Sequence, residues 1–313
     1  MPEANAPIGC LALVGLGLIG SSLARGARRF GLAQRIVAID VDAGVRARVE
    51  ELGIADAVTG DAAEGVRDAD LVILCVPVGA VGDVAAAIAG HMKPGAVLSD
   101  VGSVKGAVVA AVTPHLGDGI AFVPAHPVAG TEYSGPDAGF PTLFSGRWCI
   151  LTPPEDAPEA AVARVRGFWE GLGAIVETMT PEHHDLVLAI TSHVPHLIAY
   201  NIVGTAADLE EVTQSEVIKF SAGGFRDFTR IAASDPTMWR DVFLTNKDAV
   251  LEMLGRFNED LSALARAIRW GDGEALHALF TRTRAIRRGI VAMGQETAEP
   301  DFGRARPAAD EKA

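Results

Sequence analysis

Short apolar runs recur through the first half of the chain, and segments of helical or glycine-rich composition separate them. Runs of this length are typical of strands buried on both faces of a sheet. Strands that alternate with helices predict an α/β fold, in which a mostly parallel sheet carries helices on both faces. The runs occupy residues 10–14, 36–40, 71–76, 96–100, 120–124, 148–151 and 174–177.

The pattern changes at Thr180, which is suited to cap a helix and after which we expect no further strand. Long amphipathic stretches follow at 181–209, 211–222, 236–270 and 273–295. We therefore expect a sheet-containing domain at 1–180, an all-helical domain at 181–296 and a flexible tail at 297–313. Apolar helices beyond the needs of one core often pack against a second subunit, so we expect a homodimer formed through the helical domain.

A glycine motif follows the first apolar run and opens the first helix. Gly15 permits a tight turn, Gly17 has no side chain to block a pyrophosphate, and Gly20 lets the helix pack close to the sheet. The N–H groups of Leu18 and Ile19 at the helix start would point toward the phosphates. Together with the flanking strands, this motif predicts a doubly wound Rossmann-type domain that binds NAD, and a purely structural turn is the alternative.

Asp40 ends the second apolar run, where such domains bind the adenosine ribose. Its carboxylate can accept hydrogen bonds from the ribose hydroxyls and would repel the additional phosphate of NADP, which favours NAD. Arg46 and Arg48 follow closely and could tolerate a phosphate, so use of NADP stays open. Val76 and Pro77 end the third run at the same edge of the sheet, and we expect them to contact the cofactor as well.

Two further segments follow strand ends, where parallel sheets bind their ligands. Ser103, in the sequence Gly-Ser-Val-Lys, would place a hydroxyl near the nicotinamide, and the alternative is a helix cap. His126 begins the sequence His-Pro-Val-Ala-Gly and would be the proton acceptor that an NAD-linked alcohol oxidation requires. A histidine satisfied within the core is the alternative, but the following proline and glycine favour a loop and a functional role.

The first helix of the second domain carries polar residues. Ser192 and His196 are four residues apart and share one helix face, and Pro195 should kink the helix between them. Polar residues turned to solvent are an equally good interpretation. The run His-His-Asp at 183–185 resembles a metal cluster, but no third ligand has suitable spacing, so we expect these residues to be exposed and predict no metal site.

A second group of polar residues surrounds a glycine pair later in the chain. Arg226 and Arg230 are four residues apart, with Gly223 before them and Trp239 after them. Guanidinium groups bind carboxylates through two parallel hydrogen bonds, so this segment predicts a carboxylate site. An ordinary network of surface ion pairs is the alternative.

Composition restricts the classes of function. The 313 residues are 49% hydrophobic and 21% charged, as in soluble globular proteins, and the net charge of −13 argues against nucleic acids and anionic membranes as partners. The uncharged stretch 6–24 follows the strand, turn and helix pattern of the glycine motif, so we expect no membrane segment. Three widely spaced cysteines form no disulfide framework, which favours a reducing cytoplasm.

The chain resembles the prephenate and arogenate dehydrogenase family, the cyclohexadienyl dehydrogenases, over residues 8–295. The motifs that carry the resemblance are GLGLIGSSLA, DVGSVKG, HPVAGTEYSGP, TSHVPH and GGFRDFTRIAASDPTMWRD. The resemblance implies an NAD-dependent oxidative decarboxylation in tyrosine biosynthesis. In that reaction hydride leaves ring carbon C4, carbon dioxide leaves C1, and the ring becomes aromatic. Whether the substrate is prephenate, arogenate or both stays open.

The resemblance also implies roles for individual residues. His126 would accept a hydrogen bond from the C4 hydroxyl, with Ser103 nearby, and Arg230 would hold a substrate carboxylate. Arg226 stands where some relatives carry lysine, which keeps the charge but changes the geometry. The remaining matched residues would surround the substrate, and they are Thr131, Glu132, Ser192, His196, Gly223, Arg226 and Trp239.

Two other classes of function stay open. A β-hydroxyacid dehydrogenase or an imine reductase shares both types of domain, but it is not expected to carry the HPVAGTE and GGFRDFTR motifs. A non-catalytic NAD-binding sensor would need the glycines and Asp40, whereas His126 and Arg230 would be superfluous.

Overall fold

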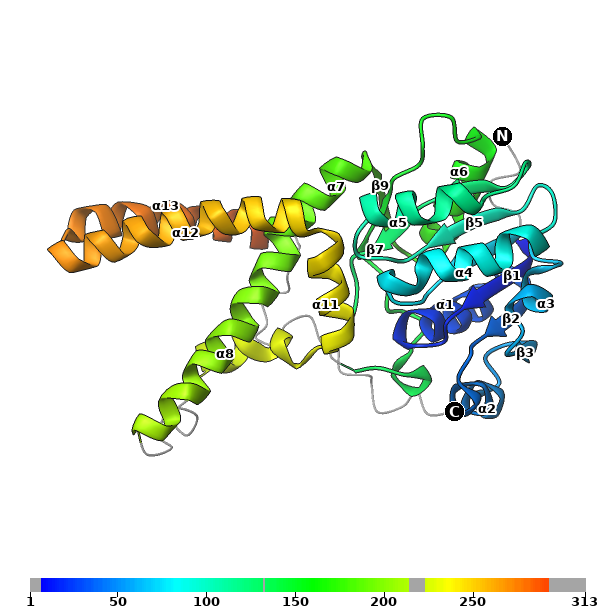
Figure 1. Ribbon diagram of the computed structural model, residues 1–313, viewed down its shortest axis with the longest axis horizontal. Coiled ribbons are helices and arrows are strands. Elements are labelled where there is room, and N and C mark those ends of the chain that lie inside the picture. Colours follow the sequence, from blue (N-terminus) through cyan, green and yellow to red (C-terminus); the bar gives the residue numbers. More distant parts are fainter. Residues whose placement is uncertain (1–6, 132, 214–222, 293–313) are drawn as a thin grey trace. The chain divides into compact units, whose positions relative to one another are not determined.

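The computed structural model describes residues 7–131, 133–213 and 223–292 (Figure 1). The chain forms two compact units, Met1–Met253 and Leu254–Ala313. The first unit contains the sheets and the helices that precede α12 (Lys247–Trp270), and α12 continues into the second unit. Glu132 and the predicted tail at 297–313 lie outside the described residues.

The first unit is built on a six-stranded sheet with the strand order β3-β2-β1-β4-β5-β6, in which neighbouring strands are parallel. This is the order of a doubly wound dinucleotide-binding fold. Its strands are β1 (Ile8–Val14), β2 (Ala33–Ile39), β3 (Ala57–Thr59), β4 (Leu71–Leu74), β5 (Val97–Asp100) and β6 (Ala121–Val123). The helices between them are α1 (Leu18–Arg29), α2 (Ala43–Leu52), α3 (Ala62–Val66), α4 (Val81–Ile88) and α5 (Gly106–Val112).

Both faces of this sheet are covered, as the sequence predicted. In β1, Leu11 and Leu13 belong to one buried cluster with residues of α1, whereas Ala12 and Val14 belong to a second cluster with residues of α4 and α5. Alternate residues of a strand point to opposite faces, so each cluster is one face of the sheet. Short 3₁₀ turns extend the connections at η1 (Val78–Ala80), η2 (Ala89–His91), η3 (Thr113–His115) and η4 (Pro136–Ala138).

The later strands form a separate sheet, which differs from the sequence-based expectation of one sheet. It has the order β7-β8-β9, with β7 antiparallel to β8 and β8 parallel to β9. Pro124 lies between β6 and β7 and has no N–H to donate, so the ladder of the first sheet stops there. The elements are β7 (Ala125–Pro127), β8 (Trp148–Leu151), α6 (Glu159–Gly171) and β9 (Ile175–Thr178).

Helices alone follow β9 among the described residues. Thr180 caps α7 by accepting a hydrogen bond from the His183 N–H, as predicted. The predicted irregularity near Pro195 is a π-helical turn, η5, directly before α8. The elements are α7 (Pro181–Leu188), η5 (Ala189–His193), α8 (Val194–Thr213), α10 (Gly223–Thr229), η6 (Arg230–Ala233) and α11 (Pro236–Thr245).

The stretch Pro181–Leu209 is the one described helical segment long and apolar enough to cross a membrane, judged by length and composition alone. Its first part carries polar side chains into the protein, because His184, Asp185 and His193 are buried. Its last part is open, with Ile202 and Val203 exposed.

The second unit continues α12 into α13 (Gly273–Ala292) through a tight turn at Gly271, whose φ of 69° favours glycine. Asp272 accepts a hydrogen bond from the Ala275 N–H and so caps the start of α13. Both helices expose large apolar side chains, including Leu261, Ile268 and Phe280.

A fully buried ion pair joins the two sheets of the first unit. Lys105 and Asp100 have no exposed side-chain surface, and Lys105 Nζ pairs with Asp100 Oδ2. Lys105 Nζ also donates to the Ala125 carbonyl at 2.7 Å, and the Ala125 N–H donates to Asp100 Oδ1 at 3.2 Å. The pair therefore connects the end of β5 to the start of β7, because two of these hydrogen bonds reach Ala125.

The substitution Lys105→Met should lower the free energy of unfolding by about 3–5 kcal/mol, because it leaves the buried Asp100 carboxylate without its cation. Urea unfolding at neutral pH measures the change. Lys93→Met is the matched control, because Lys93 pairs with Asp70 at 2.7 Å at a partly exposed site, and it should cost less than about 1 kcal/mol. Equal losses from both substitutions would contradict the importance of the buried pair.

Candidate active site

The glycine motif forms an open cradle at the carboxyl end of β1. A Cβ on Gly15 would lie 2.8 Å from the Cys75 carbonyl oxygen, and a Cβ on Gly20 would lie 2.0 Å from the Gly15 oxygen. Gly17, by contrast, has nothing within 4 Å of its Cβ position among the described residues. Gly15 and Gly20 are thus required by packing, whereas the space at Gly17 is available to a ligand.

The start of α1 faces this space with unused hydrogen-bond donors. Gly17 is the N-cap and provides no side-chain hydrogen bond, so the N–H groups of Leu18 and Ile19 retain their capacity to bind an anion. Val76 lies against Gly15, with its Cγ1 3.1 Å from the position of a Cβ there, and Pro77 starts the η1 turn. The cradle, the helix terminus and the β4 end together fit the pyrophosphate of a dinucleotide.

Asp40 is held beside the cradle at the end of β2. Its Oδ2 accepts the Leu16 N–H at 2.8 Å, and its Oδ1 accepts the Asp42 N–H at 3.0 Å. Arg46 Nη1 donates to the Asp40 carbonyl at 2.8 Å, and Arg48 forms an ion pair with Asp137 at 2.6 Å. The carboxylate is thus fixed at the edge where a ribose would bind, and both arginines already have hydrogen-bond partners.

Ser103 lies half-buried in the turn between β5 and α5. It is not the cap of α5, so that alternative is wrong. The cap comes from α7, because Asp185 Oδ1 accepts the Lys105 N–H and Oδ2 accepts the Gly106 N–H, each at 2.8 Å. The Ser103 hydroxyl is therefore not used to start the helix.

His126 lies in β7 and not in a loop as predicted, and it is 7% exposed. Pro124 and Pro127 bracket this short strand, and the loop begins only after it. The imidazole Nδ1 lies 2.8 Å from Nε2 of His184, and the two rings meet edge to face at 67°. Strand pairing with β8 fixes the backbone of His126. Because His184 occupies Nδ1, Nε2 is the ring nitrogen left to contact a ligand.

His184 and Asp185 are buried, which contradicts the prediction that the 183–185 run is exposed. His184 Nδ1 lies 2.8 Å from Asp185 Oδ1, so Asp185, His184 and His126 form a continuous row. Of the run, only His183 is exposed. The signal in the sequence was the helix start at Thr180, since it places His184 and Leu188 on one buried face.

Burial governs the protonation of this row. Burial lowers the pKa of His126 well below its usual value, and His184 and Lys105 lower it further. Burial also lowers the pKa of His184, partly offset by its hydrogen bond to Asp185. Burial alone would raise the pKa of Asp185, but the hydrogen bonds from His184, Lys105 and Gly106 hold it below its usual value.

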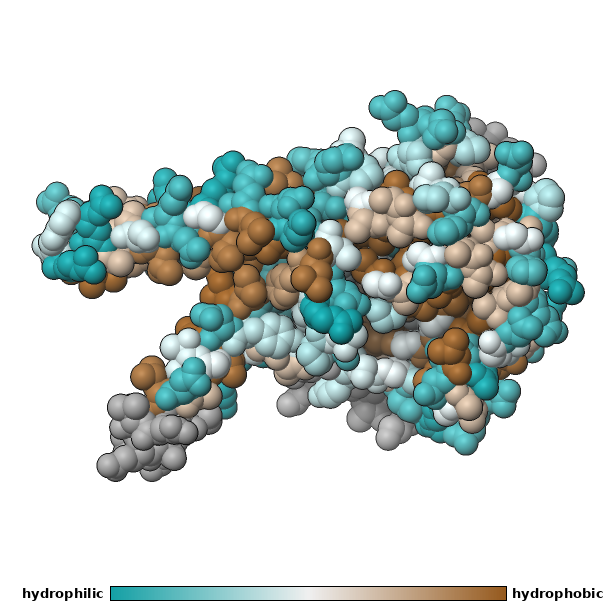
Figure 2. Space-filling model, in the orientation of Figure 1, coloured by the Kyte–Doolittle hydropathy of each residue, from teal (hydrophilic) through white to brown (hydrophobic). Residues whose placement is uncertain are grey.

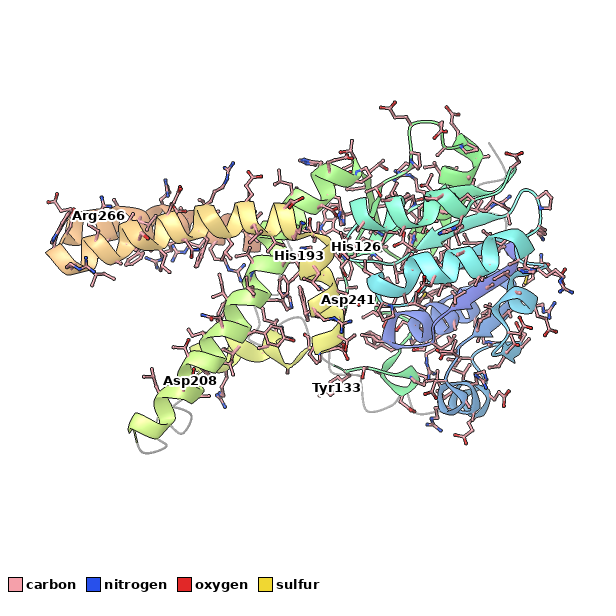
Figure 3. All side chains as sticks on the ribbon, viewed as in Figure 1. His126, Tyr133, His193, Asp208, Asp241 and Arg266 are labelled. Atoms are coloured by element: carbon pink, nitrogen blue, oxygen red, sulfur yellow. The ribbon has the colours of Figure 1, made fainter. Side chains whose placement is uncertain are left out.

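His193 lies beside this row, on the π-helical turn (Figure 3). Its Nδ1 is 3.1 Å from the Asn246 side-chain nitrogen, which also donates to the Asp185 carbonyl at 2.9 Å. Burial lowers the pKa of His193 to about 4, so the ring is neutral at physiological pH. The Asn246 amide thus connects the end of α11 to the row on α7.

A second cluster forms between α8 and α11. His196 stacks on Trp239 with ring centroids 3.8 Å apart, and its Nδ1 lies 2.7 Å from the Ser192 carbonyl, so Nδ1 carries the proton. Burial lowers the pKa of His196, and the charge of Arg230 lowers it further. The η6 turn, which carries Arg230, packs against α8. Ser192 and His196 were predicted on one helix, and Arg230 and Trp239 in a later segment. The structure brings the two groups into one region.

Three residues predicted to bind substrate, Thr131, Gly223 and Arg226, show no side-chain hydrogen bond or ion pair with either cluster among the described residues. Thr131 is exposed and accepts a hydrogen bond from the Tyr133 N–H at 3.3 Å. Arg226 is exposed on α10, and Gly223 is half-buried with Asp227 as its neighbour. Their contact with substrate stays a prediction, and Glu132 lies outside the described residues. The described residues contain no cluster of three or more potential metal ligands.

Comparison with known proteins gives matches over both halves of the chain. The family described as prephenate dehydrogenase, nucleotide-binding domain, matches residues 23–178, and its dimerization domain matches residues 180–282. A cyclohexadienyl dehydrogenase from Zymomonas mobilis is 44% identical over 90% of this chain and 95% of its own length. A prephenate dehydrogenase from Bacillus subtilis is 33% identical over 93% of this chain and 78% of its own length.

Solved structures agree with these matches. Prephenate dehydrogenase from A. aeolicus, in complex with hydroxyphenyl propionate and NAD⁺, is 34% identical and superposes with a TM-score of 0.85 over 91% of this chain and 99% of its own. Arogenate dehydrogenase from Synechocystis is 27% identical, with a TM-score of 0.76 over 90% of this chain and 99% of its own. The predictions of the fold class, of an NAD-dependent dehydrogenase and of the family are confirmed. The chain belongs to the prephenate dehydrogenase family.

Proposed function

We propose that this chain oxidises and decarboxylates prephenate, arogenate or both, with NAD as the hydride acceptor, to give 4-hydroxyphenylpyruvate or tyrosine in tyrosine biosynthesis. The observation that carries the proposal is a buried histidine, His126, whose Nε2 is the side left for a ligand at the carboxyl edge of a dinucleotide-binding sheet. The relatives named above support the substrate class, since they comprise cyclohexadienyl, prephenate and arogenate dehydrogenases.

The reaction asks for one base that can also return a proton. The C4–H bond breaks with its electrons leaving as hydride, and the C4 hydroxyl gives its proton to His126 Nε2. The bond from C1 to the carboxylate also breaks, its electron pair enters the ring, and the ring becomes aromatic. The resulting phenolate oxygen takes the proton back from His126, so no proton is released overall. A histidine suits both steps, because its neutral form accepts the proton and its protonated form returns it.

The cofactor seat consists of the glycine cradle, the α1 terminus, Asp40 and the ends of β4 and β5. NAD, when bound, accepts the hydride from C4. Gly17 leaves room for the pyrophosphate, and the Asp40 carboxylate accepts hydrogen bonds from the adenosine ribose. Because Arg46 and Arg48 already have partners, a 2′-phosphate would meet Asp40 first, which favours NAD over NADP.

The substrate is held from the helical side. Arg230 binds a carboxylate, His196 and Trp239 form an aromatic wall, and Ser192 lies on the same helical segment as His196. Ser103 donates its hydroxyl toward the C4 oxygen from the turn after β5. The family motifs also assign Thr131, Gly223 and Arg226 to substrate binding, together with Glu132, which lies outside the described residues.

We assign residues 1–180 to nucleotide binding and 181–296 to substrate binding and dimerisation. The matched dimerization domain, at 180–282, supports a homodimer. So does exposed apolar surface on α8, where Figure 2 shows apolar side chains and Ile202 and Val203 are 40% and 39% exposed. Pairing of two such helices in a dimer would bury this exposed apolar surface. The three free cysteines suit the cytoplasm.

The function is tested by following NADH absorbance with prephenate or arogenate, and with NAD or NADP. We expect NAD-dependent turnover with at least one of the two substrates. In the same assay, His126→Asn should lower kcat by roughly a hundredfold or more, with a smaller change in KM. Turnover of a hydroxyacid alone would favour the β-hydroxyacid dehydrogenase class. NAD binding without turnover of any substrate would favour a sensor, and near-normal kcat in His126→Asn would remove the base assignment.

Arg230→Gln should raise KM for prephenate or arogenate by roughly tenfold or more, because the substrate carboxylate loses a charged partner. KM for NAD should stay within about threefold, since the cofactor binds on the other side of the site. Arg240→Gln is the matched control, because Arg240 is exposed and pairs with Asp241. An unchanged substrate KM in Arg230→Gln would remove Arg230 from the anchor role.

The acid limb of the kcat/KM profile should lie below pH 6.5. His126 acts as a base only when neutral, and burial together with His184, Lys105 and His193 lowers its pKa, so activity is retained as the pH falls through 6.5 and lost only at lower pH. Steady-state rates between pH 4.5 and 8 in constant ionic strength measure this limb. An acid limb above pH 6.5 would contradict a buried, neutral His126.

A further inference from the structure

The row of Asp185, His184 and His126 has a function beyond packing. We propose that Asp185 and His184 are positioning residues that hold His126 in the tautomer with its proton on Nδ1, so that Nε2 is always the unprotonated nitrogen presented to the substrate. The tautomer follows from contacts within the protein. Its importance for catalysis rests on the function proposed above.

Asp185 accepts hydrogen bonds from two backbone N–H groups, whose role as donors is fixed. The backbone N–H groups of Lys105 and Gly106 can only donate, and they meet the two carboxylate oxygens at 2.8 Å each. These hydrogen bonds favour the ionised carboxylate, which can only accept. The third contact, from Oδ1 to His184 Nδ1 at 2.8 Å, therefore requires a proton on His184 Nδ1.

The proton on His184 Nδ1 determines the next contact. A neutral imidazole with a proton on Nδ1 has an unprotonated Nε2, and burial favours the neutral form of His184. His184 Nε2 then accepts, so the nitrogen 2.8 Å away, Nδ1 of His126, must donate. Since burial also keeps His126 neutral, its remaining nitrogen, Nε2, carries a lone pair and no proton.

The row also keeps a hydrogen-bond acceptor, His184 Nε2, beside His126 after it has taken a proton. The Nδ1–H group of an imidazolium is a stronger donor, so its hydrogen bond to His184 strengthens, and the Asp185 carboxylate lies at the far end of the row. The other charged or titratable groups that influence His126 are Lys105 and His193, and both disfavour positive charge there.

The row is also mechanically fixed. Asp185 is tied to α5 through two backbone N–H groups and to Asn246 through its own carbonyl at 2.9 Å. His126 is tied to β8 through strand pairing. A rotation of either imidazole would break at least one of these short contacts, so the orientation of Nε2 is set by elements from both halves of the chain.

The tautomer is measured directly by nitrogen NMR of the full-length protein labelled with ¹⁵N-histidine, near pH 7.5. His126→Asn identifies the signals of His126 by their loss. We expect His126 with a protonated Nδ1 and an unprotonated Nε2. A protonated Nε2 in the wild-type protein overturns the proposal, whatever the enzymatic activity. Absence of turnover with both substrates would instead overturn the proposed function and leave the tautomer result standing.

Substitutions at position 184 test the catalytic consequence. His184→Leu removes the acceptor, so kcat should fall by roughly a hundredfold, KM should stay within about threefold, and the His126 signals should show loss of the single Nδ1–H tautomer. His184→Gln retains an acceptor oxygen and should preserve more of the activity and of the tautomer. His183→Gln is the matched control, because His183 is adjacent and exposed, and its kcat should be unchanged.

The outcomes separate a positioning role from a merely structural one. Thermal unfolding shows whether each variant folds. If His184→Leu does not fold, the results for His184→Gln test the positioning role. A folded position-184 variant that has lost the acceptor but keeps wild-type kcat and the Nδ1–H tautomer contradicts the proposal. So does a fall in kcat in His184→Gln to the level of His126→Asn with the tautomer unchanged. Asp185 is unsuitable for substitution, because its loss would also uncap α5.

Discussion

The arrangement of this protein depends on a charged pair that water cannot reach. Taking Lys105 and Asp100 out of water is costly, and the cost is offset only because every available partner is used. Asp100 accepts from Gly102, Ala125 and Lys105, and Lys105 donates in addition to the Ala125 carbonyl. These bonds fix the end of β5 to Ala125, the first residue of the strand that carries His126. The proposed base, His126, is thereby held at the edge of the sheet that carries the glycine motif.

The features that depend on local chemistry could be predicted from the sequence. Gly15, Gly17 and Gly20 are required by a turn, an open space and a close approach, and their spacing along the chain is typical of a dinucleotide-binding turn. Asp40 and His126 could be found because they lie at or near strand ends. The doubly wound order followed from the alternation of apolar runs and helices.

The features that depend on distant packing could not be predicted in this way. His184 and Asp185 are polar, adjacent and at a helix start, so composition alone suggests exposure, and only the docking of α7 on the α5 terminus buries them. Ser103, close to the start of α5, was considered as its cap. The cap is instead Asp185, which lies eighty residues after Lys105 in the chain. The second sheet was missed because one proline, Pro124, ends the first.

The double use of Asp185 links chemistry to folding. One carboxylate caps the N-terminus of α5 and also ends the row of imidazoles, so the docking of α7 completes both the helix and the proposed base. A chain in which α7 has separated from α5 would leave the helix start without its acceptor and His126 without a defined proton position. Local opening of this one segment would therefore inactivate the enzyme while its nucleotide-binding sheet stays folded. The activity of this protein would therefore depend on whether one short helix, α7, stays docked on α5.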